Sequence, residues 1–325
     1  MMHVVCDDGS TNVKLAWFKD GEMKTSVTAN SFRQGWKVDG LGGGRVYNYS
    51  LNGMRYTADN VSREAIVTTN VEYQYSDMNL LAVHHALLCS GLDPQPVSLT
   101  VTLPVSEYYD ADCQPDEDNI RRKQENLMRK LEVNRGTSFT VTEVNVMPES
   151  LPAVFSSLAK LNVSEVETTL VIDLGGTTLD GGVIVGQFDS VSAVHGNPNI
   201  GVSMVTRAAM TAMRSAGSDT SAYVADQVVR NRSDRQFLES VINDSARVDY
   251  VIETIEAEIE KLGTLVVNDL APFRHVNRVF LAGGGAELIE NAVRNAWPLA
   301  NDRICLLDDA QLALAREIAL YRNEG

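Results

Sequence analysis

The sequence predicts an α/β protein in which one fold occurs twice. Apolar strands alternate with helical segments along the 325 residues, which is the pattern of the α/β class. An apolar strand ending in aspartate, then a turn rich in glycine, serine and threonine, then a return strand, occurs at Asp7 and again at Asp173. The two aspartates lie 166 residues apart (173 minus 7), about half the chain. A duplicated fold with one such turn in each copy is the simplest explanation.

The first half contains the elements expected of one copy. Gly9 and Asn12 suit the positive φ values of the turn between the first two strands, and Gly91 fits just beyond the end of a helix. The predicted elements are strands at 3–8, 13–18, 65–69, 98–103 and 139–147, and helices at 78–88, 116–131 and 151–161.

The second half repeats this alternation. Strands are predicted at 168–173, 182–185 and 276–282, and helices at 248–266, from 286, and at 309–321. We expect the last helix to return and pack on the first half. The predicted domains are therefore 1–160 plus 307–325, and 161–306.

Composition limits the classes of partner. The chain has 28 basic and 43 acidic residues, a formal net charge of -15, so direct DNA binding is disfavoured and a basic partner is expected. No stretch is long and apolar enough to span a bilayer, and the start is unlike a signal peptide. The four cysteines are scattered without metal-like spacing, and we expect them to be reduced and structural in a cytoplasmic protein.

The first turn has the composition of a phosphate-binding loop. Gly9 allows close approach of the backbone to an anion, the hydroxyls of Ser10 and Thr11 can donate to phosphate oxygens, and Lys14 adds positive charge. Asp7, at the end of the strand, could hold a hydrated Mg²⁺. Taken alone, the segment could equally be a plain hairpin turn.

The second turn, residues 173–180, repeats this composition. Two carboxylates from separate strands would repel one phosphate chain unless a cation lay between them. The alternative is an Asp-Gly-Gly turn without a ligand. The first turn makes that alternative much weaker.

A third glycine run, residues 283–285, precedes a predicted helix. Glycines before a helix N-terminus offer a surface open to a ribose or a base, although one glycine run is weak support by itself. Neither GxxxxGK[ST] nor a GxGxxG motif opening the first helix is present, so P-loop and Rossmann folds are not indicated.

These three turns, in this order, resemble the two phosphate motifs and the adenosine motif of the actin, heat-shock-chaperone and sugar-kinase ATPases. More closely, the chain resembles the StbA (ParM) family of actin-like plasmid segregation ATPases, nearly end to end. This resemblance implies an actin-like fold, with two duplicated ribonuclease-H-like domains, mixed sheets flanked by helices, and a nucleotide cleft between the domains. The runs that carry it are 7–12, 51–53, 75–77, 83–88, 107–110, 146–150 and 173–180.

The resemblance also implies roles for individual residues, with ATP (or GTP) and Mg²⁺ as cofactors. Asp7 and Asp173 would flank Mg²⁺ through water, and Glu149 and Asp173 would be catalytic, Glu149 by activating the attacking water. The alternative for Glu149 is an acidic residue favoured by the dipole of the helix that follows it. The residues expected to bind the nucleotide are Asp8, Gly9, Ser10, Thr11, Asn12, Lys14, Gly175, Gly176, Thr177, Thr178, Gly201, Gly283, Gly284, Gly285 and Glu287.

The function implied is an ATP-dependent filament that polymerises to segregate low-copy plasmid DNA in the bacterial cytoplasm. Hydrolysis would destabilise the filament, and a DNA-binding adaptor protein at a centromere-like site would capture its ends. The main alternative is a small-molecule kinase of the same fold. Such a kinase needs a catalytic base beside a substrate pocket, and no segment of the sequence can be assigned to one. A chaperone-like switch would require a peptide-binding domain, and a membrane-docked relative would require a basic amphipathic segment. We expect neither from this sequence.

Three further segments allow only modest predictions. The pair His84-His85 could suggest a metal site, but adjacent helical residues face different ways, so packing is favoured. The glycine-rich stretch 39–44 predicts a surface excursion, and 231–235 a solvated connection.

Overall fold

The first half of the molecule is built on a five-stranded mixed sheet. The computed structural model describes residues 1–39 and 45–324. The sheet has the order β3-β2-β1-β7-β9, with three antiparallel strands followed by two parallel ones. The strands are β1 (Met2–Asp8), β2 (Asn12–Lys19), β3 (Glu22–Ala29), β7 (Pro96–Leu103) and β9 (Thr140–Pro148).

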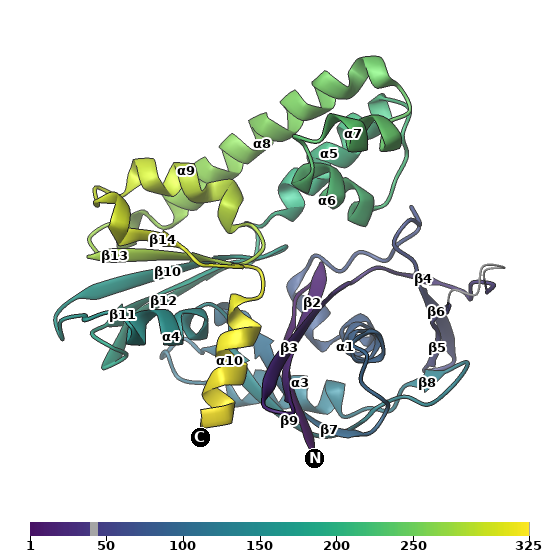
Figure 1. Cartoon of the computed structure of the whole chain (residues 1–325), viewed down its shortest axis with the longest axis horizontal. Helices are drawn as coiled ribbons and strands as arrows, with labels where there is room; N and C mark the ends of the chain where they lie inside the picture. Colours follow the sequence, from purple (N-terminus) through teal and green to yellow (C-terminus); the bar gives the residue numbers. More distant parts are fainter. Residues whose placement is uncertain (40–44, 325) are drawn as a thin grey trace.

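The second half repeats this topology strand for strand (Figure 1). Its sheet has the order β12-β11-β10-β13-β14, again with three antiparallel strands and then two parallel ones. The predicted α/β fold with two duplicated mixed sheets is confirmed. The strands are β10 (Thr168–Leu174), β11 (Leu179–Val185), β12 (Ser190–Asn197), β13 (Arg278–Ala282) and β14 (Ile304–Leu306).

A smaller sheet of four strands belongs to the first half alone. Its order is β4 (Phe32–Gln34), β6 (Met54–Ala58), β5 (Asn48–Leu51) and β8 (Glu132–Val133). The strand predicted at 65–69 is wrong. That segment is irregular and leads into the 3₁₀ turn η1 (Val71–Tyr75), because no neighbouring strand pairs with it among the described residues.

Helix α1 (Asp77–Cys89) runs through the core between these two sheets (Figure 1). Ser76 caps its N-terminus, and Gly91 follows its end with φ +83°, as predicted. His84 and His85 are buried, and burial lowers the pKa of each to about 4, so both are neutral. They are packing residues, as expected, and His85 hydrogen-bonds the hydroxyl of Tyr49 at 2.7 Å.

The remaining helices cover the sheets. They are α2 (Val105–Tyr108), α3 (Glu117–Leu127), α4 (Phe155–Ala159), α5 (Ser203–Ser215), α6 (Ala222–Arg230), α7 (Arg235–Val241), α8 (Val248–Asp269), α9 (Ala286–Ala296) and α10 (Ala313–Glu324). The helix predicted at 151–161 is instead a 3₁₀ turn, η2 (Leu151–Val154), followed by the five-residue α4. The polar segment 231–235 does connect two helices, as predicted.

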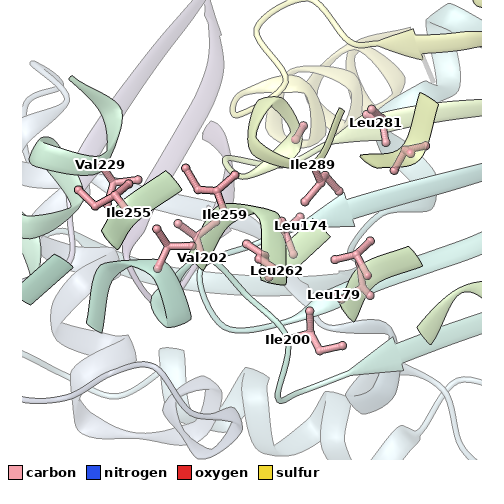
Figure 2. Packing of buried hydrophobic residues seen from close by; sticks show 14 of the residues in the cluster. Leu174, Leu179, Ile200, Val202, Val229, Ile255, Ile259, Leu262, Leu281 and Ile289 are labelled. Atoms are coloured by element: carbon pink, nitrogen blue, oxygen red, sulfur yellow. The ribbon is translucent and has the colours of Figure 1, made fainter. Parts of the chain in front are cut away.

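The core of the second half lies between its sheet and its helices. Helix α8 buries Val248, Val251, Ile255, Leu262 and Val266 on one stripe, as its 3.6-residue periodicity predicts. In Figure 2, residues of α8 meet residues of β10, α6 and α9.

A separate apolar cluster joins the two halves. It contains Val5 of β1, Val171 of β10, Phe280 of β13 and Ile318 of α10. Helix α10 packs on β1, β2 and η2, so the end of the chain returns to the first half, although the exact domain division stays a prediction. Within 1–39 and 45–324, no helix could cross a bilayer.

Two smaller predictions have different outcomes. All four cysteines are free, but Cys89 and Cys113 are exposed and are not core residues, whereas Cys6 is buried. Of the glycine-rich stretch 39–44, residues 40–44 lie outside the described part of the chain.

Candidate nucleotide-binding site

A cleft between the two halves brings the predicted turns together. Its space amounts to about 610 Å³, open solvent at its mouth included. The predicted residues that line it are Asp7, Gly9, Ser10, Thr11, Lys14, Glu149, Asp173, Gly175, Gly176, Thr177, Thr178, Gly283 and Gly284.

The two Gly-rich loops touch each other across this cleft. The hydroxyls of Ser10 and Thr177 are hydrogen-bonded at 2.6 Å. A Cβ atom on Gly176 would lie 2.5 Å from Cγ2 of Thr11, so only glycine permits this approach. The first loop is held by Asn30 and Thr68, whose side chains donate to the Ser10 carbonyl at 2.9 and 2.6 Å. The hydroxyls and backbone of both loops therefore face one small volume.

Two buried aspartates stand on opposite sides of this volume. Asp7 accepts a hydrogen bond from Lys14 at 3.0 Å, yet burial still raises the pKa of its carboxyl. Burial first, and then the charges of Asp7 and Asp180, raise the pKa of Asp173 to about 7. Negative charge in the cleft is thus only partly compensated.

This shortage of positive charge fits a divalent cation. Within the described residues, no three His, Cys, Asp or Glu side chains form a closed metal cage. Two carboxylates, with waters and phosphate oxygens as the other ligands, are the arrangement that Mg²⁺ favours. Asp7 and Asp173 are the residues that would hold it.

Glu149 follows β9 at the floor of the cleft. Its amide donates to the Leu103 carbonyl at 2.8 Å, and Thr102 donates to its carboxylate at 3.5 Å. Burial, and then the charge of Asp180, raises the pKa of Glu149 well above its ordinary value. The segment that follows is the 3₁₀ turn η2, which runs into the five-residue helix α4, so the dipole available to Glu149 is that of a short helical segment.

The third glycine run fits tightly behind the second loop. Gly283 has φ +85°, and a Cβ atom there would lie 2.2 Å from Oδ1 of Asp173. Gly284 faces the cleft, where the nearest side chains are Arg230 and Gln311. Gly285 is buried and donates to the Leu174 carbonyl at 2.9 Å, so it supports the loop from behind.

Five predicted nucleotide contacts do not line the cleft, and for some the structure gives another role. Asp8 has no exposed surface, because it is paired with Lys123 in the core, so it has none to offer a nucleotide. Gly201 packs against the backbone of the second loop, and Gly285 lies behind it as described above. Asn12 lines neighbouring grooves, and Glu287 is exposed at the start of α9.

Several residues of the cleft carry no local signal in the sequence. Tyr73 and Gln74 come from η1, Pro104 follows β7, Gln311 precedes α10, and Leu314 lies in its first turn. They reach the cleft because distant segments return to it. No Gly-rich motif surrounds any of them.

Family models decide the assignment. Two models, described as the N-terminal and C-terminal parts of plasmid segregation protein ParM, match residues 2–160 and 163–321. The chain belongs to the ParM family of plasmid segregation proteins. This ParM-family assignment favours the plasmid-segregation interpretation over the small-molecule kinase. No curated protein sequence is detectably similar to the chain.

Solved structures show the same fold at low identity. The non-polymerisable quadruple mutant of pCBH ParM is 14% identical with a TM-score of 0.74, and covers 100% of this chain and 99% of its own. A 15-stranded ParM filament from Clostridium botulinum is 13% identical, with a TM-score of 0.71 and the same coverage. The ADP complex of the archaeal actin homologue Ta0583 is 15% identical, with a TM-score of 0.65 and full coverage of both chains. The predicted actin-like fold is confirmed.

Proposed function

We propose that this ParM-family protein is an ATPase that binds ATP (or GTP) with Mg²⁺ in the cleft and forms filaments that segregate plasmid DNA. One observation supports it above all. Two Gly-rich loops from duplicated halves meet over a space that also contains Asp7, Lys14, Glu149 and Asp173. The ADP complex of Ta0583, a protein of the same fold, is consistent with a nucleotide in this place.

The cleft residues have distinct binding roles. The loops supply backbone N–H groups and the hydroxyls of Ser10, Thr11 and Thr177 to the β- and γ-phosphates, and Lys14 supplies charge. Gly284, which lines the cleft beside Arg230 and Gln311, is the proposed contact for the adenosine. The bound cation would neutralise phosphate charge and the carboxylates of Asp7 and Asp173.

Glu149 is the residue proposed to activate water. The water oxygen bonds to the γ-phosphorus, the bond to the β–γ bridging oxygen breaks, and Glu149 accepts the proton of the water. The charges of Asp7 and Asp173 raise the pKa of Glu149 after burial and the charge of Asp180, so a cation held by these two aspartates would lower that pKa in part and favour the base form of Glu149.

Occupancy of the cleft would also control assembly. Beside the cleft, the halves are bridged by Arg63 with Asp219 at 3.2 Å, and by Ser221, which donates to the Asn60 carbonyl at 2.6 Å. A nucleotide held by both loops stabilises this closed arrangement. Closed subunits can then associate head to tail into a helical filament, which hydrolysis weakens. The solved relatives from C. botulinum and from the B. subtilis plasmid pLS32 are filaments.

The acidic surface suggests how DNA is reached. With a formal net charge of -15, the filament repels phosphate backbones and favours a basic surface. We propose that a DNA-binding adaptor protein at a plasmid site links the filament to its cargo.

Light scattering after addition of ATP tests the filament, and phosphate release tests the chemistry. Glu149→Ala should assemble like wild type but release phosphate about 10²- to 10⁴-fold more slowly. Glu143→Ala, on the exposed face of the same strand, is the matched control and should behave like wild type. A flat scattering trace with ATP and with a non-hydrolysable analogue, across micromolar concentrations, would contradict the filament.

A further inference from the structure

A buried lysine lies behind the first loop. Lys123 of α3 has no exposed surface, and its ammonium donates to Oδ2 of Asp8 at 2.5 Å, to Oε1 of Gln74, and to Oδ1 of Asn79 at 3.3 Å. Asp8 neutralises its charge. A lysine ammonium is a donor only, so each atom facing it must be an acceptor.

This requirement fixes the orientation of Gln74. The carbonyl oxygen of its side chain faces Lys123, so its NH₂ group is at the other end. Gln74 is 5% exposed and lines the cleft, and within residues 1–39 and 45–324 no acceptor is recorded for its NH₂ group. Two donors are therefore directed to the cleft without a protein partner.

Contacts through the core connect Gln74 to Glu149, which lines the same cleft. The amide of Thr102 donates to Oδ1 of Asp8 at 3.3 Å, and the Thr102 hydroxyl donates to Glu149 at 3.5 Å. A continuous set of contacts thus runs from Gln74 through Lys123, Asp8 and Thr102 to Glu149. The Gly284 and Gln311 side of the cleft is not part of this set.

We propose that Gln74 donates hydrogen bonds to the terminal phosphate of the bound nucleoside triphosphate, and that Lys123 is the positioning residue that turns its NH₂ group toward that phosphate. This rests on the proposed nucleotide site. Gln74 then distinguishes a triphosphate from a diphosphate, because the atoms it contacts are missing from ADP. Lys123 contacts no nucleotide and acts through Gln74.

The test compares two affinities in the full-length protein. Dissociation constants for a non-hydrolysable ATP analogue and for ADP, both with Mg²⁺, are measured below the concentration at which scattering rises. Gln74→Leu should weaken binding of the analogue roughly 10- to 100-fold and binding of ADP less than about threefold. The control is Gln124→Leu, because Gln124 of α3 donates to the Val144 carbonyl and lies outside the cleft. It should leave both constants unchanged.

The role of Lys123 needs a variant that leaves no unpaired buried charge. Asp8→Asn with Lys123→Met removes both charges and should reproduce the selective loss of affinity for the analogue. Adding Gln74→Leu to this pair should cause no further loss, because the two changes remove one interaction. Additive losses would assign Lys123 a purely structural role and overturn that part of the proposal.

The remaining outcomes separate this inference from the proposed function. If wild type binds neither nucleotide, the nucleotide site itself is wrong. If wild type binds both and Gln74→Leu weakens both equally or neither, the site stands and the role of Gln74 is wrong.

Discussion

The two Gly-rich loops share one backbone plan and differ in charge. In the first half, Asp7 pairs across the hairpin with Lys14, whereas in the second half the equivalent pair is Asp173 with Asp180. Lys14 neutralises its neighbour at 3.0 Å, but Asp180 instead accepts a hydrogen bond from the amide of Val105 in the other half, at 2.7 Å. The duplicated fold thus presents the same hairpin geometry twice, and one cross-strand position gives the first loop a positive charge that the second loop lacks.

The largest effect is expected from removing the positive charge of Lys14, which the second loop lacks. Lys14→Met leaves Asp7 buried without its partner and removes charge from the phosphate site. Affinity for an ATP analogue with Mg²⁺ should fall at least about a hundredfold, with stability lower by about 3 kcal/mol. Asp180→Asn is the counterpart in the second loop and should not lower that affinity. Equal losses for both variants would remove the distinction between the loops.

The second prediction concerns pH in the nucleotide-free protein. The pKa of Asp173 is about 7 in the folded state, above its ordinary value near 4, so the folded state binds more protons between these values. The free energy of unfolding should therefore fall as pH rises from 4 to 7, by roughly 3 kcal/mol. Urea denaturation at each pH measures it, and Asp173→Asn should flatten the decline. A decline of the same size in that variant would show that other groups cause it.

The third prediction compares how tightly the loops are packed. A Cβ atom on Gly201 would lie 2.6 to 2.8 Å from backbone atoms of the second loop, whereas on Gly9 it would meet one backbone oxygen at 2.9 Å. Gly201→Ala should lower the free energy of unfolding by about 1–2 kcal/mol, more than Gly9→Ala does. Gly175→Ala is the control, since its nearest atom is at 3.4 Å. Thermal unfolding that ranks Gly9→Ala first would reverse this comparison.

The smallest effect is expected at the ion pair that joins the halves beside the cleft. Arg63 and Asp219 are 70% and 45% exposed, so water screens their ion pair. Arg63→Ala should cost at most about 1 kcal/mol and speed ADP release less than about fivefold. Stopped-flow release of a fluorescent ADP analogue measures this rate. Ser221→Ala should have the larger effect, because that hydroxyl is buried and bridges the halves.

The local parts of this molecule could be predicted from the sequence, and the parts that depend on distant packing could not. The strand-turn-strand units at Asp7 and Asp173 are contiguous, so their composition indicates both the duplication and the loops. Gln74 and Lys123 meet only in the folded core, 49 positions apart in the sequence, and an isolated glutamine or lysine gives no hint of this.

The wrong strand at 65–69 shows the same limit. Its β-branched residues favour extended structure, but Thr68 uses its hydroxyl to hold the first loop and Val67 is 75% exposed. The family resemblance places Asp8 among the nucleotide contacts, although alternate strand residues face opposite ways. Its side chain therefore points into the core.

The apolar cluster that joins the two halves is placed to act as a hinge between them. Val5, Val171 and Phe280 form an apolar contact between the halves, whereas the ion pair of Arg63 with Asp219 and the hydrogen bond of Ser221 are polar contacts that water can replace. Rotation about this hinge is therefore the motion of least resistance. The loops lie near this pivot and the outer ends of the halves lie far from it. If the proposed nucleotide binds there, a small displacement of the loops would become a larger displacement at the outer ends of the two halves.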